Sequence, residues 1–272
     1  MKDFKDKIVV ITGAGSGMGR AYAMAFAKLG AKLALNDYDA KALDETVRLL
    51  PPGMAKRVTS LAFDVADKVA MYGFADQVSA TLGKAHVVVN NAGIEGAVQP
   101  TWRTSEEDYE RIMRINFFGV LHGTKAFLPQ LLANREGAIV NVSSIFGLIG
   151  TPNSSDYCAS KFAVRGFTEA LMVELHDSPI SVHLVHPGGI ATNIARRPEG
   201  QAFAKQYLTT PPEDIVEYVI KGIRQKRVKI VYGRDAWRTW LGSNLLPQRW
   251  LNAIVSRELK RTYDPSAYNV LR

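Results

Sequence analysis

Residues 8–19 read IVVITGAGSGMG, a short apolar run followed by a glycine-rich turn. The run from Ile8 to Ile11 is typical of a strand that is buried on both faces of a parallel sheet. Glycines in the turn permit positive φ angles and let the backbone approach a diphosphate closely. The helix expected over residues 18–29 would direct its N-terminus at that anion. The stretch therefore predicts a strand–turn–helix unit for a dinucleotide, although the glycine spacing alone is a weak signal.

Acidic residues at the ends of the next two strands bear on the choice of dinucleotide. Asp37 follows the strand expected over residues 32–36. A carboxylate there can hydrogen-bond a ribose 2′-hydroxyl and would repel a 2′-phosphate, and Arg20 lies just after the glycine-rich turn rather than within it. The sequence thus favours NAD over NADP. The alternative for Asp37 is a helix cap or turn residue, with Asp39 the better cap candidate. Asp64, which ends the third expected strand, is a candidate for contacting the edge of the adenine ring. Its interpretation as a turn residue is equally open.

Strands and helices alternate along most of the chain, which predicts an α/β fold with a doubly wound parallel sheet of about seven strands and helices on both faces. In such sheets ligands bind beyond the carboxyl ends of the strands, where the polar motifs of this chain fall. We expect strands over residues 8–11, 32–36, 58–63, 86–89, 138–142, 181–185 and 228–232, and helices over residues 18–29, 39–50, 69–82, 105–132, 155–176 and 211–224.

The strongest chemical signal is the pair Tyr157 and Lys161, which lie four residues apart on an expected helix and so share a face. A free phenol has a pKa of about 10 and transfers protons poorly at neutral pH. A neighbouring cation favours the phenolate and would lower that pKa. Ser144 lies thirteen residues before the tyrosine, and Ser143 is its rival for the same role.

Together these motifs resemble those of the short-chain dehydrogenase/reductase family over about residues 5–233. The resemblance implies a single Rossmann-type domain and an NAD(P)-dependent oxidoreductase. The matching residues are Thr12-Gly13 to Gly17, Gly19, Asp64-Val65, Asn90-Asn91-Ala92-Gly93, Asn116, Ser144, Tyr157, Lys161, Pro187-Gly188 and Thr192.

The resemblance also implies a role for each catalytic candidate. Tyr157 would be the general acid/base, and Lys161 would lower its pKa and hold the nicotinamide ribose. Ser144 would donate a hydrogen bond to the substrate oxygen. Asn116 would help position a water, unless it is only a polar residue in a packed helix.

The cofactor-binding residues implied by the resemblance run through the whole domain. Thr192 would bind the nicotinamide carboxamide, and Asn90 and Gly93 would form the turn beside the adenosine. The full expected set is Gly13, Ser16, Gly17, Met18, Gly19, Asp37, Asp64, Val65, Asn91, Ala92, Gly93, Tyr157, Lys161, Pro187, Gly188, Ile190 and Thr192.

Two apolar segments indicate the substrate class. Residues 145–149 follow Ser144, and residues 190–212 lie where the family places a mobile substrate loop, with Glu95 as a further candidate at the rim. We expect a hydrophobic secondary alcohol or ketone as substrate. The alternative is a non-catalytic NAD(P)-binding regulatory or scaffold protein of the same fold; the intact Tyr157 argues against it.

The segment after the last strand, residues 234–272, departs from the family pattern and puts the usual tetramer in doubt. We expect a helical C-terminal extension beyond a catalytic domain at residues 1–233, and the resemblance implies a homodimer or homotetramer. Three interpretations of the extension remain open: a helix pair packed on the body, a lid over the substrate mouth, or a peripheral membrane contact. Pro247 would break one continuous helix.

Bulk properties exclude several classes of protein. The chain has 272 residues, 47% of them hydrophobic, with a net charge of +8 and one cysteine, Cys158. A single cysteine leaves no internal disulfide and no cysteine-rich metal site, so we expect a cytoplasmic protein without a metal. The basic residues at 224–234 and 257–261 are interpreted as a solvated face, with an anionic membrane or an acidic partner as the alternatives and no nucleic-acid partner expected.

Overall fold

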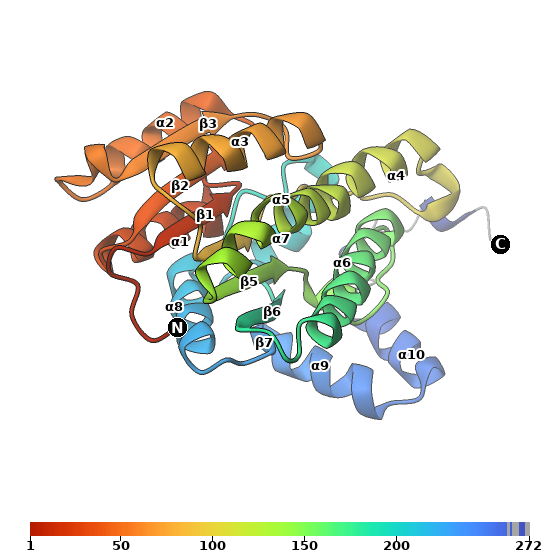
Figure 1. The fold of residues 1–272 in the computed structure, drawn as a ribbon. Coiled ribbons are helices and arrows are strands. Elements are labelled where there is room, and N and C mark those ends of the chain that lie inside the picture. The colour runs from red at the N-terminus through yellow and green to blue at the C-terminus, as the bar shows by residue number, and fades with distance from the viewer. Residues whose placement is uncertain (260–261, 263–266, 270–272) are drawn as a thin grey trace.

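The computed structural model describes residues 1–259, 262 and 267–269, and its strands form one parallel sheet in the order β3-β2-β1-β4-β5-β6-β7 (Figure 1). The doubly wound fold predicted from the sequence is confirmed. The strands are β1 (Ile8–Thr12), β2 (Lys32–Asp37), β3 (Val58–Ala62), β4 (Val87–Asn90), β5 (Gly137–Val142), β6 (Ile180–Pro187) and β7 (Lys229–Tyr232).

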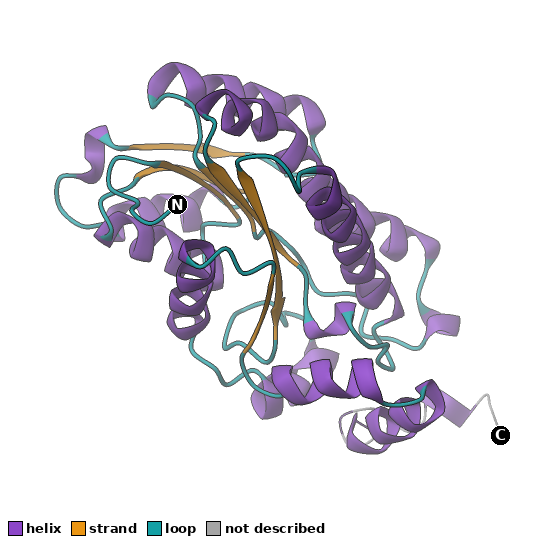
Figure 2. Ribbon diagram, turned by 60° about the horizontal axis from the view of Figure 1, so that its bottom comes forward, coloured by secondary structure: helices purple, strands orange, loops and turns teal. Residues whose placement is uncertain are grey.

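Helices cover both faces of this sheet (Figure 2). One face carries α1 (Gly17–Lys28), α2 (Ala40–Leu49) and α8 (Pro212–Arg224), and the other carries α3 (Lys68–Thr81), α5 (Gly119–Asn134) and α6 (Ser155–Glu174).

The two faces of β1 show how these layers bury their residues. Val9 belongs to the apolar cluster under α1 and α8, and Val10 belongs to the cluster under α3 and α5. Phe26 and Phe74 are fully buried in these two clusters. Burying each such side chain stabilises the fold by about 2 to 3 kcal/mol. β1 is therefore apolar and buried on both faces, as the sequence predicted.

The helical stretch expected over residues 105–132 contains a local distortion. It consists of α4 (Glu106–Met113), a π-helical turn (Arg114–Phe118) and α5. Single π turns inside helices occur often at functional sites. This turn carries Asn116, one of the expected catalytic residues.

The C-terminal part of the chain has the expected helical extension and one unexpected helix, α7. The substrate loop contains α7 (Gln201–Tyr207), and the extension forms α9 (Ala236–Leu245) and α10 (Gln248–Leu259), separated at Pro247. The buried residues of α10 pack with Leu148 and Ile149, so this helix pair lies on the body of the protein beside β7 (Figure 1). None of the described helices is long and apolar enough to cross a bilayer.

Candidate active site

The Tyr157–Lys161 pair lies on the first turns of α6, with Ser144 on the segment that leaves β5. Lys161 is buried, and its Nζ donates a hydrogen bond to the carbonyl oxygen of Val142 at 3.1 Å. The same Nζ lies 5.6 Å from the centroid of the Tyr157 ring. The helical spacing therefore brings phenol and ammonium together as predicted.

Burial shifts the pKa values of both members of this pair. Burial raises the pKa of Tyr157 to about 12, and the Ser144 side chain acts in the opposite direction. Burial also lowers the pKa of Lys161 to about 8. Burial is the largest influence on both groups because it disfavours the charged form of each, and the role that the resemblance implies for Lys161 stays a prediction. At neutral pH the tyrosine is a proton donor.

The structure separates the two rival serines. Ser143 donates its hydroxyl hydrogen to the backbone carbonyl of Lys161 at 2.8 Å, which commits it to joining β5 and α6. Ser144 Oγ accepts a hydrogen bond from the amide of Phe146 at 3.1 Å, which leaves its own hydroxyl hydrogen free to be donated. This geometry favours Ser144 as the donor to a substrate oxygen.

His186 on β6 fixes the backbone of Ser144. Its Nδ1 lies 2.7 Å from the Ser144 carbonyl oxygen, and burial lowers the pKa of this histidine to about 4. The ring is therefore neutral, and Nδ1 donates because a carbonyl oxygen only accepts. The sequence analysis did not predict this contact.

Asn116 ties the π turn to the loop after β4. Its Oδ1 accepts from the Ile94 amide at 2.8 Å, and its Nδ2 donates to the Ile94 carbonyl at 3.1 Å and to Ser160 Oγ at 3.1 Å. Gly93 lies against the same groups: a Cβ there would be 3.2 Å from Asn116 Oδ1 and 3.4 Å from Lys161 Nζ. The structure thus brings Asn116, Gly93 and Lys161 together.

The glycine-rich turn is shaped by close backbone contacts. Gly13 has a φ of +68°, and a Cβ on it would lie 2.9 Å from the Cα of Ala92. A Cβ on Gly19 would lie 1.8 Å from the Gly13 carbonyl oxygen, so only glycine fits there. Asn91 completes the contact, because its Nδ2 donates to the Thr12 carbonyl at 3.0 Å. These contacts join the ends of β1 and β4.

Ser16 and Thr192 lie where the turn opens toward the substrate loop. Ser16 is the N-cap residue of α1, and its side chain makes no capping hydrogen bond. A Cβ on Gly17 would lie 3.0 Å from Thr192 Cγ2, so the loop after β6 reaches the helix N-terminus. Met18 packs its side chain in the core, which leaves its backbone amide in the first turn as the group able to bind an anion.

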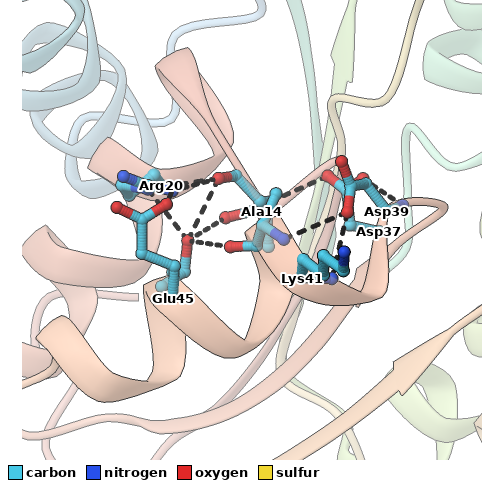
Figure 3. A network of polar contacts seen from close by, with 9 residues as sticks. Ala14, Arg20, Asp37, Asp39, Lys41 and Glu45 are labelled. Atoms are coloured by element: carbon cyan, nitrogen blue, oxygen red, sulfur yellow. Dashed lines mark hydrogen bonds and ion pairs between the residues drawn. The ribbon is translucent and has the colours of Figure 1, made fainter.

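Asp37 lies at the other side of the turn (Figure 3). Its carboxylate accepts hydrogen bonds from the amides of Gly15 at 2.8 Å and Asp39 at 2.9 Å. Arg20 is engaged elsewhere: its guanidinium donates to the Gly15 carbonyl at 2.6 Å and pairs with Glu45 at 2.7 Å. Asp39 caps α2, as the sequence predicted, by accepting from two amides of its first turn.

Three predicted positions make contacts within the protein. Asp64 Oδ1 accepts a hydrogen bond from the amide of Ala66 at 2.9 Å, as a turn residue does. The side chain of Asp64 is exposed. Val65 is buried in the core. The side-chain amide of Asn90 is buried and donates to Thr124 Oγ1 at 3.0 Å and Asn141 Oδ1 at 2.8 Å, and its place in a turn beside the adenosine stays a prediction.

The segment after β6 is held from both sides. Gly188 at the end of this strand donates its amide hydrogen to the Tyr232 carbonyl at 2.8 Å. Ile190 packs its side chain in the core and, through an isolated bridge, pairs with Thr210 at the far end of the loop. Pro187 pairs in register with Tyr232 of β7. The base of the substrate loop is therefore fixed to the sheet.

An aromatic wall flanks the tyrosine on its substrate side. The ring of Phe146 lies 6.0 Å from that of Tyr157 and 5.9 Å from that of Phe203, and Phe203 lies 4.9 Å from Tyr207. Both expected segments contribute, because Phe146 follows Ser144 and Phe203 belongs to α7.

Glu95 attaches the substrate loop to the body. Its Oε1 accepts from the amide of Arg197 at 2.6 Å and also from the amide of Arg196. Arg197 also pairs with Asp108 at 3.2 Å. Sequence reasoning named Glu95 only as a rim residue; contacts between positions about a hundred residues apart leave no local pattern.

Asp156 is a further residue that the sequence analysis missed. It is buried, and its carboxylate accepts from the amides of Tyr157 at 2.7 Å and Ala97 at 2.7 Å. It therefore joins the loop after β4 to the start of α6. Its position directly before the tyrosine was the only available signal.

The residues at this site fit a dinucleotide. A close-packed glycine turn, a helix N-terminus with an uncommitted Ser16 and the Asp37 carboxylate line one end, with Thr192 against Gly17, and Lys161 lies at the other end. The first group suits a diphosphate and a ribose, and Lys161 lies beside the Tyr157 ring.

Comparisons with known proteins agree with this geometry. The family model described as short chain dehydrogenase matches residues 7–201. The chain is 43% identical over 250 residues to the "Putative oxidoreductase SadH" of Mycobacterium tuberculosis, and the match covers 87% of this chain and 89% of that protein. It is 31% identical over 267 residues to estradiol 17-beta-dehydrogenase 11 of Homo sapiens, covering 97% of this chain and 86% of that protein.

The fold also matches solved structures. A short-chain dehydrogenase/reductase from Burkholderia phymatum in complex with NAD superimposes with a TM-score of 0.80 at 29% identity, covering 97% of this chain and 98% of that chain. The expected family is confirmed by matches that span most of the sequence. The chain therefore belongs to the short-chain dehydrogenase/reductase family of NAD(P)-dependent oxidoreductases.

Proposed function

We propose that the protein transfers a hydride between NAD(H) and a hydrophobic secondary alcohol or ketone. The observation that carries the proposal is the position of Tyr157. The tyrosine lies beside Ser144 and Lys161 and against the aromatic wall of Phe146 and Phe203.

In the proposed reduction, Tyr157 donates its hydroxyl proton to the substrate carbonyl oxygen. NAD(H), when bound, supplies the hydride that the carbonyl carbon receives. Ser144 donates a hydrogen bond to the same oxygen and stabilises the negative charge that develops there. A tyrosine kept protonated by burial suits this direction.

Lys161 and Asn116 complete the proposed proton path. Lys161 holds the ribose hydroxyls next to Tyr157. The hydrogen bond from its Nζ to the Val142 carbonyl oxygen fixes the position of the ammonium group. Asn116 holds the loop at Ile94 and positions a water behind the lysine. In the oxidation, the same groups take the proton from the alcohol.

We propose NAD rather than NADP as the cofactor. The Asp37 carboxylate lies next to Gly15 and would repel a 2′-phosphate. Arg20, the nearest guanidinium in sequence, is paired with Glu45 and bonded to Gly15. The solved neighbour from Burkholderia phymatum was crystallised with NAD.

The proposed substrate class rests on the apolar lining and on one relative. The wall beside Tyr157 contains Phe146, Phe203 and Tyr207, and Leu148 and Ile149 lie behind it. The name of the human relative refers to estradiol, a hydrophobic secondary alcohol. Such a lining favours a substrate whose body is apolar and whose reactive oxygen is its main polar group.

Turnover with a substrate panel tests the proposal. Secondary alcohols are offered with NAD or NADP and ketones with the reduced forms, and the near-ultraviolet absorbance of the reduced cofactor is followed. We expect Tyr157→Phe to keep NADH affinity within a few-fold and to lose nearly all turnover. Activity in this variant would refute the role of Tyr157. Tight NADH binding without turnover on any substrate would favour the non-catalytic alternative.

A second proposal concerns self-association. Phe118 and Leu132 of the π turn and α5, and Phe162 of α6, are large exposed apolar side chains on neighbouring elements. We propose that this surface forms a homodimer contact. Light scattering after size exclusion tests it: Phe162→Glu should lower the measured mass to that of one chain, and an unchanged mass would refute it.

A further inference from the structure

The C-terminal helix pair is apolar on two sides, and only one side is covered. Leu251, Val255 and Leu259 of α10 recur at every fourth residue and are buried against Leu148 and Ile149. These positions share a helical face. Packing on the body of the protein therefore explains the buried apolar face of α10.

The outer side carries a second apolar stripe, which packing does not explain. On α9, Trp237 and Leu245 are 63% and 70% exposed, and Leu241 lies between them at the same spacing of four. On α10, Trp250 and Ile254 are 57% and 42% exposed and again lie four residues apart. We call these five residues, together with the exposed Leu246 of the connecting turn, the outer stripe.

The outer stripe follows the two helices of the pair and the turn between them. The rings of Trp237 and Trp240 stack with their centroids 4.7 Å apart, and Leu246 leads from α9 into α10. Arg238 near the start of α9 pairs with Glu258 near the end of α10 at 3.1 Å, so the two helices form a hairpin. A shallow depression lies beside Trp250 and Ile254 and includes Arg249.

The charged groups around the outer stripe leave an excess of positive charge. The nearby carboxylates, Asp235 and Glu258, both pair with Arg238. In the part of the chain that the structure describes, Arg249 and Arg257 form no ion pair. These two free guanidinium groups lie on the exposed side of α10 next to Trp250 and Ile254.

We propose that the outer stripe binds the surface of an anionic lipid bilayer. Exposed tryptophans beside leucine and isoleucine suit the boundary between headgroups and acyl chains, and free arginines suit anionic headgroups. A second copy of this chain fits less well, because pairing the stripe with itself brings Arg249 and Arg257 near like charges. The proposed homodimer surface lies on α5 and α6, which are different helices from the pair that carries the outer stripe.

Vesicle flotation of the full chain tests this inference without any measurement of turnover. We expect wild-type protein to float with vesicles of phosphatidylcholine and phosphatidylglycerol at low salt, to bind pure phosphatidylcholine vesicles less, and to be released by salt. Failure to bind the anionic vesicles at low salt would overturn the proposal. The result is independent of the proposed reaction, which a substrate panel tests separately.

Matched variants locate the binding surface. The double change Trp237→Gln with Trp250→Gln should reduce the fraction of bound protein at least tenfold. Leu49→Gln is the control, because Leu49 is also half exposed but lies on α2 at the other edge of the sheet. Equal binding by the tryptophan variant and wild type would overturn the assignment to the outer stripe.

Charge variants test the arginines separately. Arg249→Gln with Arg257→Gln should remove the preference for anionic over neutral vesicles, whereas Arg48→Gln on α2 should keep it. Unchanged melting temperature and NADH affinity verify that each variant is folded. If the tryptophan variant instead lowers the oligomeric mass while wild type binds no vesicles, the stripe is a contact between copies and the proposal is wrong.

Discussion

The carboxylate of Asp37 accepts a hydrogen bond from the backbone amide of Gly15 at 2.8 Å. This contact joins the end of β2 to the middle of the glycine-rich turn, twenty-two residues earlier in the chain. A Cβ on Gly15 would lie 2.9 Å from the same carboxylate, so the turn and the acid fit each other only with glycine there. The acid thus has both a structural duty and a proposed role in cofactor choice.

The substitution Asp37→Asn separates the hydrogen bond to Gly15 from the proposed role in cofactor choice. The side-chain amide of the variant would still offer an oxygen to the Gly15 amide but would no longer repel a 2′-phosphate. We expect the ratio of kcat/KM for NAD to that for NADP to fall about tenfold, which corresponds to about 1.4 kcal/mol. Asp39→Ala is the control: it removes a helix cap and costs about 1 kcal/mol of stability without changing that ratio. An unchanged ratio in Asp37→Asn would contradict the cofactor proposal.

Burial of Lys161 predicts a dependence of stability on pH. Its pKa falls from 10.5 to about 8 in the folded protein. Between these values the unfolded chain holds a proton that the folded chain has released, so the contribution of Lys161 to stability rises with pH. Below about pH 8 both states are protonated and the full cost of burying the charge is present.

Urea unfolding of wild type and Lys161→Met at several pH values checks this dependence. The variant removes the charge and keeps most of the volume, so the difference in unfolding free energy isolates the lysine. As the pH rises from about 8 to 10.5, we expect the unfolding free energy of wild type to increase relative to that of the variant by up to about 3 kcal/mol. A constant difference would show that the ammonium group is not desolvated as the structure indicates.

The contact of Glu95 with the substrate loop predicts a change in loop opening. Glu95→Ala removes the acceptor for the amides of Arg196 and Arg197. Loss of these bonds should speed hydrogen exchange at residues 194–208 and raise the KM for a ketone about tenfold. Glu199→Ala, an exposed change in the same loop, should alter neither quantity. If hydrogen exchange at residues 194–208 is as slow in Glu95→Ala as in wild type, the Glu95 contact does not hold the loop closed.

The packing of α10 predicts unequal effects of two leucine changes. Leu251 is buried beside Leu148 and Ile149, whereas Leu241 on α9 is largely exposed. We expect Leu251→Ala to lower the unfolding free energy by about 2 to 3 kcal/mol and Leu241→Ala by less than about 0.5 kcal/mol. Because the same cluster backs Phe203, Leu251→Ala should also change kcat/KM for bulky ketones, with the KM for NAD kept. Equal effects of the two changes would contradict this packing.

Much of the fold follows from local patterns. Each expected strand and helix is present in the structure with its ends displaced by a few residues, because apolar runs, glycines and caps act through nearby atoms. The exception is the stretch expected as one helix over residues 105–132, where the π turn at Asn116 depends on hydrogen bonds to Ile94 across the site. The short helix α7 was also missed, since seven residues give little periodic signal.

The site divides in the same way. Helical spacing by itself places Tyr157 and Lys161 on one face, and the strand–turn–helix pattern by itself predicts the close-packed glycine turn at Gly13 and Gly19. Only the tertiary structure decides that Ser143 donates to α6 while Ser144 lies beside Tyr157, and that Glu95 meets Arg197. Spacing along one element fixes neighbours a turn apart through backbone geometry alone. Which side chains meet from distant segments depends on the order of strands in the sheet and on the loops that join them, and no local pattern carries that information.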